Sequence, residues 1–178
     1  MATTGELLVQ MSTLTTGTAL EHFTNINFSG SINPDDATNY LERALIELLF
    51  MNEDLVGIGD QNGLKGSDIE GSLYIALLTG DPGENGSQLV EVNYDGYTRV
   101  PIVRGNSGWE YKEAGAKNIP VATWQPNEGS LVTITYFAVM DSLQGGNMLF
   151  RKELPSPIDI PTGDQAQISY NQLTVKMN

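Results

Sequence analysis

The sequence has no cysteine, a single histidine and few basic residues, and each shortage excludes a class of protein. Without thiols there are no disulfides, thiolate metal sites or cysteine nucleophiles, so stability must come from packing or assembly. Nine Lys and Arg stand against 22 Asp and Glu, which gives a formal net charge of -13 at pH 7. Phosphate backbones and anionic membrane surfaces repel so acidic a chain, which argues against nucleic-acid and membrane partners.

Long apolar runs are also missing. No stretch approaches the roughly 20 residues that a membrane helix needs, and the N-terminus lacks the basic and apolar regions of a signal peptide. We therefore expect a protein that is made in a cytoplasm and is not exported by that route. Hydrophobic residues make up 40% of the chain and recur in short blocks between 19 glycines and 8 prolines. This pattern predicts a folded chain with many turns.

The first 33 residues differ in composition from the rest. They are rich in Thr, Ser, Asn and Gly, and the spacing of their apolar residues fits neither a helix nor a single strand. These apolar residues are Leu7, Leu8, Val9, Leu14, Leu20, Phe23, Ile26 and Phe28. We predict an extended N-terminal arm over residues 1–33, held by a neighbouring subunit, and one domain over residues 34–178.

The strongest local pattern follows the arm and is typical of a helix. Asn33 can cap a helix that has Pro34 at its first position. An apolar stripe with helical spacing comes next, made of Leu41, Ala44, Leu45, Leu48 and Leu49. The pattern predicts a helix from about 34 to 51, with Ile46 and Phe50 off the stripe.

A series of short β segments follows a glycine-rich loop. Residues 72–79 are apolar on both faces, which is typical of a central strand, and we expect the helix stripe to cover one face. Further strands are predicted at 97–103, 108–112, 119–124, 131–140, 147–154, 166–170 and 173–177. The pattern predicts a mainly β chain: an antiparallel β-sandwich or jelly-roll-like domain with one N-terminal helix and an extended arm.

The sequence offers no convincing set of catalytic residues. His22 is the only histidine, and it lies in the arm. Residues 105–108 resemble a nucleophile elbow only superficially and fit a turn better. Asp81 and Glu84 form an acid pair in a turn, but 22 acids make chance pairs certain. We predict that the chain is not an enzyme and has no catalytic, cofactor-binding or metal-binding residue.

Two further features could bind ligands, but ordinary structural roles explain both better. Residues 60–63 resemble the start of a calcium loop, but its twelfth position is Gly71, and Glu70 falls one residue short. An Asn-Gly turn is the better interpretation. Aromatic residues in the middle third could stack on sugars, although core filling or subunit contact is commoner. They are Tyr94, Tyr97, Trp109, Tyr111 and Trp124.

Several sequence blocks follow one another in a distinctive order. They are NYLERALIELLF (39–50), LYIALLTGDP (73–82), GYTRV (96–100), TITYFAVMD (133–141), GGNMLF (145–150), IPTGD (160–164) and LTV (173–175). Together, these blocks resemble a family of small phage proteins usually labelled tail fibre proteins. Residues 1–33 and 55–70 have no counterpart in that family and look like an added arm and an insertion.

The resemblance implies a structural protein of a tailed-phage virion: an exterior subunit of a tail fibre or of its attachment, assembled in the host cytoplasm. The arm would join it to other virion proteins, and we expect a homo-oligomer, with a trimer as the first guess. A head decoration protein that stabilises the capsid is the alternative. A carbohydrate-binding module that recognises a host receptor is a further alternative.

Overall fold

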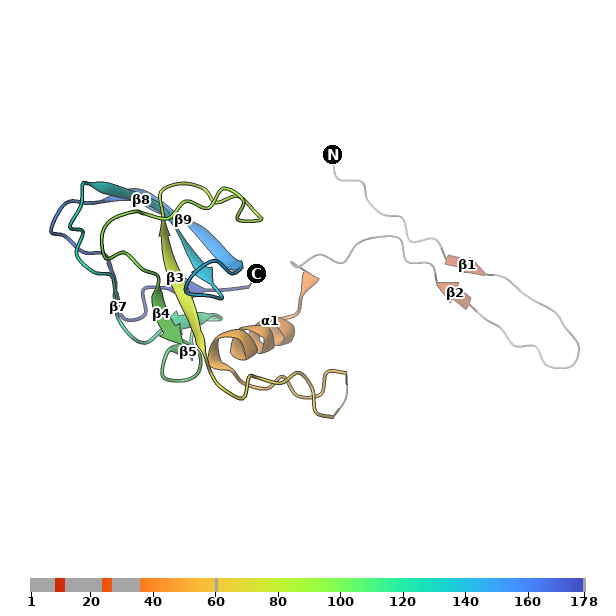
Figure 1. The fold of residues 1–178 in the computed structure, drawn as a ribbon. Coiled ribbons are helices and arrows are strands. Elements are labelled where there is room, and N and C mark those ends of the chain that lie inside the picture. Colours follow the sequence, from red (N-terminus) through yellow and green to blue (C-terminus); the bar gives the residue numbers. More distant parts are fainter. Residues whose placement is uncertain (1–8, 12–23, 27–35, 60, 178) are drawn as a thin grey trace, which may run out of the picture. The chain divides into compact units, whose positions relative to one another are not determined.

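The computed structural model describes residues 9–11, 24–26, 36–59 and 61–177. The chain divides into two compact units, residues 1–37 and 38–178. In the first unit, β1 (Val9–Met11) pairs antiparallel with β2 (Thr24–Ile26) (Figure 1). The scattered apolar pattern indicated neither strand. The other residues predicted for the arm lie outside the described residues, so its boundary between residues 33 and 34 stays a prediction.

The second unit is mainly β, as predicted. Its described residues form nine strands in three antiparallel sheets and one helix. The largest sheet has the order β4-β3-β8-β9, and the smaller ones are β11-β6-β5 and β10-β7. The strands are β3 (Ser72–Leu78), β4 (Val100–Val103), β5 (Trp109–Tyr111), β6 (Ala116–Asn118), β7 (Ala122–Thr123), β8 (Val132–Met140), β9 (Met148–Ile160), β10 (Gln167–Ile168) and β11 (Thr174–Val175). All three sheets contribute to one hydrophobic core.

Strand β3 lies at the centre of the largest sheet, between β4 and β8 (Figure 1), and it carries buried side chains on both of its faces. Leu73, Ile75 and Leu77 face the main core, whereas Ala76 and Leu78 belong to a second cluster. The prediction of a strand buried on both sides is therefore confirmed. Tyr74, Leu89, Tyr136 and Met148 pack against this second cluster, and no residue of the helix belongs to it.

The helix begins later than predicted. Helix α1 spans Asn39–Ile46, and its N-cap is Thr38. The backbone of Thr38 is extended, and its hydroxyl oxygen accepts a hydrogen bond from the Leu41 N–H at 3.4 Å. The predicted start at Pro34 is wrong, because residues 36 and 37 are not part of the α-helix. No helix in the described part of the chain is long and apolar enough to cross a membrane.

The buried face of the helical segment also differs from the prediction. The side chains of Ile46, Phe50 and Met51 are buried, whereas the predicted stripe is only half-buried. After α1 the chain continues as a π-helical turn over Glu47–Met51, and the wider turn changes the direction of the last side chains. Phe50 then packs edge-on against Trp109, with ring centroids 4.7 Å apart. The helical segment therefore packs into the main core, on the face of β3 that carries Leu73, Ile75 and Leu77.

Arg104 and its neighbour satisfy the carbonyl groups at the end of this segment. The Arg104 guanidinium donates to Leu48 O and Leu49 O, both at 2.7 Å, and the Gly105 N–H donates to Phe50 O at 2.8 Å. Carbonyls in the last turn of a helix lack partners within the helix, so these bonds fix its end to the sheet.

Prolines account for two errors in the predicted strands. The strand predicted at 119–124 is replaced by β6 and β7, which lie on either side of Pro120, a residue that cannot donate to a ladder. Conversely, β9 runs past the predicted end at 154 through Pro155 and Pro157 to Ile160. It is an outer strand of its sheet, where proline is tolerated.

Candidate functional site

The candidate catalytic residues have different outcomes in the described part of the chain. His22 and Asp60 lie outside the described residues. Ser107 is exposed in a turn, where the N–H groups of Gly108 and Trp109 both donate to Gly105 O at 3.0 Å. This arrangement supports the interpretation of residues 105–108 as a turn.

The acid pair in the turn after β3 binds a single arginine. Asp81 Oδ1 lies 2.8 Å from Arg151 Nη1, and Glu84 Oε2 lies 3.0 Å from Nη2. Both acids are well exposed to solvent. A carboxylate that serves as a general acid is usually kept in a dry pocket, so this geometry is typical of a surface ion-pair cluster that fastens the turn to β9.

The glycine-rich stretch forms a stapled loop. Leu55 and Leu64 exchange both backbone hydrogen bonds, at 2.8 and 2.9 Å. The Asn52 amide donates to Ser67 O and accepts from the Ser67 N–H, both at 2.8 Å. Among the described residues, no group of three or more His, Cys, Asp or Glu could hold a metal ion. We call residues 52–59 and 61–67 the stapled loop.

A carboxylate within the stapled loop acts as a structural link. Asp54 accepts from Lys65 Nζ at 2.7 Å and from the Gly66 N–H at 2.9 Å. These bonds hold the pKa of Asp54 below its usual range. Apolar side chains project from the loop and its flank despite this order: Val56, Ile58, Leu64 and, most exposed at 83%, Ile69. Exposed apolar groups on an ordered loop are typical of a protein contact surface.

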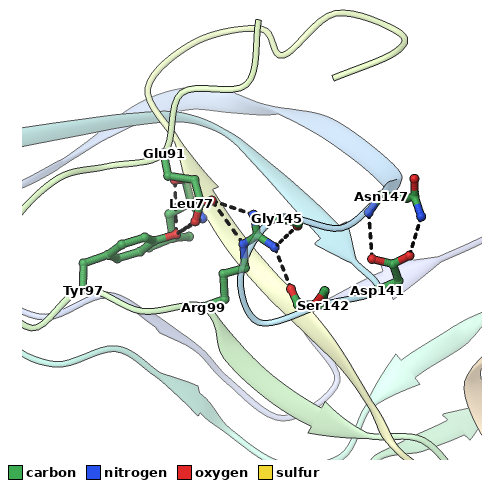
Figure 2. A network of polar contacts seen from close by, with 8 residues as sticks. All are labelled: Leu77, Glu91, Tyr97, Arg99, Asp141, Ser142, Gly145 and Asn147. Atoms are coloured by element: carbon green, nitrogen blue, oxygen red, sulfur yellow. Dashed lines mark hydrogen bonds and ion pairs between the residues drawn. The ribbon is translucent and has the colours of Figure 1, made fainter. Parts of the chain in front are cut away.

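A buried polar network lies where β3 meets the turn between β8 and β9 (Figure 2). The side chain of Arg99 is only 6% exposed. Its Nε and Nη2 donate to Glu91 Oε1 at 3.1 and 2.8 Å. Its Nη1 donates to Ser142 O at 2.6 Å and Gly145 O at 2.8 Å. The guanidinium of Arg99 thus links residues 91–99, which directly precede β4, to the turn at 141–147.

Tyr97 and Asp141 complete the network. The Tyr97 hydroxyl donates to Glu91 Oε2 at 2.8 Å and accepts from the Leu77 N–H at 3.0 Å. Burial raises the pKa of Tyr97 far above its usual value, so the hydroxyl keeps its proton and remains a donor. Asp141 accepts two hydrogen bonds from Asn147, both at 2.7 Å, and they lower its pKa. The network therefore fixes the conformation of the loop at 91–99 and of the turn at 141–147.

The aromatic residues of the middle third fill the core. Trp109, Trp124 and Tyr94 are buried, as the core interpretation of these residues predicts. Tyr94 and Tyr97 pack edge-on with centroids 5.6 Å apart, and the Arg43 guanidinium lies 4.9 Å from the centre of the Tyr111 ring. A sugar stacks on an exposed ring face, and the two tryptophans offer none.

The main core opens to the surface through an apolar groove of about 790 Å³. Leu77, Ile134 and Phe137 line it from the four-stranded sheet, together with the second half of β9 and residues 164–169. We call this opening the β9–β10 groove. Its lining is largely aliphatic, and Asp159, Asp164 and several Gln side chains are its polar members.

A family model described as "Podophage GP4 fiber I protein gp80" matches residues 69–176, which is more than half of the chain. The chain belongs to this phage fibre family. The predicted resemblance to phage tail fibre proteins is thereby confirmed. No curated protein matches the chain. Membership identifies a fibre-type structural protein, a virion component that associates with other virion proteins.

The fibre-family match covers a distinct part of the structure. All nine strands from β3 to β11 lie within it, as do the Arg99 network and the β9–β10 groove. Helix α1 and the stapled loop precede it, although the sequence resemblance had included residues 39–50. The helix and the stapled loop therefore lie outside the matched residues, although Ile46, Phe50 and Met51 pack into the same core.

Sequence reasoning missed both the Arg99 network and the groove. Arg99 lies in the GYTRV block, and a signal was available there because the acidic chain has only nine basic residues. The groove carries no such signal, since its walls come from segments far apart in the sequence.

Proposed function

We propose that the chain is an exterior structural subunit of a tail fibre, or of the fibre's attachment, that works as a homo-oligomer without catalytic activity. The fibre-family match over residues 69–176 carries this proposal. The exposed Asp81–Glu84–Arg151 cluster supports it, because these acids are engaged in surface ion pairs.

The segments that precede the matched residues supply the means of attachment in this proposal. The stapled loop holds Val56, Ile58 and Leu64 toward solvent on a backbone fixed by the Asn52–Ser67 and Leu55–Leu64 bonds. A fixed backbone reduces the entropy lost on binding a neighbour. The N-terminal arm adds a second contact. The strongly acidic character of the chain keeps it soluble at high local concentration.

Neither alternative has comparable support. A head decoration protein also needs a soluble oligomeric β domain, but the family match is to fibre proteins. A glycan receptor module needs accessible aromatic rings, and three of the five aromatic residues considered for sugar stacking, Tyr94, Trp109 and Trp124, are buried.

Deleting residues 1–33 tests the attachment part of the proposal. We expect the shortened protein to keep its thermal melting transition, because the hydrophobic clusters lie in residues 38–178, and to disappear from purified particles. The melting transition is measured on the purified shortened protein. Incorporation is measured in purified particles after complementing a phage that lacks the gene. Deleting only residues 2–6 is the matched control, since it spares the scattered apolar residues of the arm.

Two results would contradict this expectation. Loss of the melting transition would make the arm part of the domain's own fold. Normal incorporation of the shortened protein would place the attachment surface elsewhere, with the stapled loop as the next segment to test.

A further inference from the structure

The β9–β10 groove is an opening in the main core. Phe137, Leu154, Ala166 and Ile168 pack against the buried core cluster but are themselves only partly buried, and all four line the groove. Ile158 in the same wall is 50% exposed. Apolar side chains gathered in a concave opening favour an apolar occupant, since filling it removes their surface from water.

The backbone around the groove suits an extended occupant. Among the strands of the described chain, β9 has β8 as its one neighbour and β10 has β7, so each strand has a side on which no described strand pairs. The β8–β9 register jumps from Ile134↔Ile158 to Tyr136↔Glu153, so residues 154–157 bulge out of the ladder, and Leu154 and Pro155 among them line the groove. Extended peptides bind by adding to such strand edges and placing alternate side chains in pockets.

The chemistry of the wall distinguishes a peptide from a sugar. Trp124 lines the groove but is 2% exposed, so its ring face is covered. Its indole N–H is buried without a hydrogen-bond partner in the described structure. A peptide brings aliphatic side chains that match this largely aliphatic wall, whereas a sugar needs an exposed ring face to stack on.

Charge then limits which peptide can bind. The chain as a whole is strongly acidic, and Asp159 and Asp164 lie at the groove, so an acidic segment is repelled. Residues 1–33 contain two acids, Glu6 and Glu21, and no Lys or Arg. They are rich in Thr and carry spaced Leu, Val, Ile and Phe, a composition that favours extended structure.

We propose that the β9–β10 groove receives an extended apolar segment of the N-terminal arm of a second copy of this chain. This inference rests on the proposed function, because it takes the arm to be an assembly element. It adds the surface that receives the arm and makes the contact one between identical subunits. Such an exchange closes the open core of each subunit with a strand from its neighbour.

The absence of cysteine makes a direct test available. One full-length copy carries Gln167→Cys, an exposed position that lines the groove, and a second full-length copy carries Thr13→Cys or Thr18→Cys in the arm. The purified proteins are mixed and mildly oxidised, and disulfide-linked heterodimers are quantified. Ser107→Cys, exposed in a turn away from the groove lining, is the control position.

We expect about tenfold more heterodimer with Gln167→Cys than with Ser107→Cys for at least one arm position, because bound segments meet at a raised effective concentration. Adding Ile158→Glu to the groove copy should reduce the yield to the control level. Adding Val103→Glu, at a strand position of similar exposure outside the groove, should leave it unchanged. Unchanged melting temperatures confirm that both variants fold.

Equal yields at Gln167→Cys and Ser107→Cys would overturn the proposal. So would cross-linking of Gln167→Cys to a different virion protein in particles, or protection of this cysteine by host polysaccharide. If arm deletion abolishes incorporation but no groove cross-link forms, the proposed function stands and this inference fails. If the cross-link forms but the protein is absent from the fibre, the inference stands and the proposed function fails.

Discussion

Replacing Arg99 with methionine is expected to lower the free energy of unfolding by about 3–5 kcal/mol, the usual loss when one partner of a buried ion pair is removed. Arg99 is buried and supplies hydrogen bonds to the Glu91 carboxylate and to the carbonyls of Ser142 and Gly145. Methionine fills similar space but donates nothing. Glu91 would remain beside the Tyr97 hydroxyl without its counter-charge, and two carbonyls would lose their donor.

Arg151→Met is the matched control for this substitution. Arg151 also binds two acidic side chains, but its partners are exposed to water. Exposed ion pairs contribute little to stability, so the control should lose much less than Arg99→Met. Urea denaturation of both variants measures the difference. Equal losses in the two variants would show that the Arg99 network does not hold the loops together.

Replacing Phe50 with alanine is expected to cost about 3–5 kcal/mol, the range for a large buried aromatic residue. Phe50 is fully buried and packs against Trp109 and Phe150, with ring centroids 4.7 and 5.8 Å away. The matched control is Leu45→Ala, on the half-buried stripe. It should cost clearly less, because Leu45 is only partly buried and part of the removed side chain already meets solvent.

This pair of variants tests which face of the helical segment is buried. Thermal or chemical denaturation of Phe50→Ala and Leu45→Ala gives the two losses directly. A loss for Leu45→Ala as large as that for Phe50→Ala would restore the face predicted by helical spacing and would contradict the π-helical turn.

The sequence was most informative where the local pattern alone determines the structure. The uninterrupted apolar run at 73–78 predicted a central strand, and β3 lies at the centre of its sheet. The sequence alone did not determine where the helix begins, because both Asn33 and Thr38 are good capping residues. Only the folded backbone shows that Thr38 is extended and caps α1.

The buried helix face and the polar site depend on tertiary contacts. Helical spacing assumes a regular turn, whereas the carbonyls of residues 48–50 bond to Arg104 and Gly105, more than fifty residues away. The Arg99 network joins residues 91–99 to a turn at 141–147 in the same way. Periodicity within one segment carries no information about such partners.

The protein's place in the particle is tested by immunogold labelling of purified virions with antibodies against the full-length chain, with particles that lack the gene as the control. The account of a fibre-family structural subunit predicts gold on the tail fibres or at their attachment, and none in the control. Gold distributed over the capsid would instead identify a head decoration protein, and particles without label would contradict an exterior position.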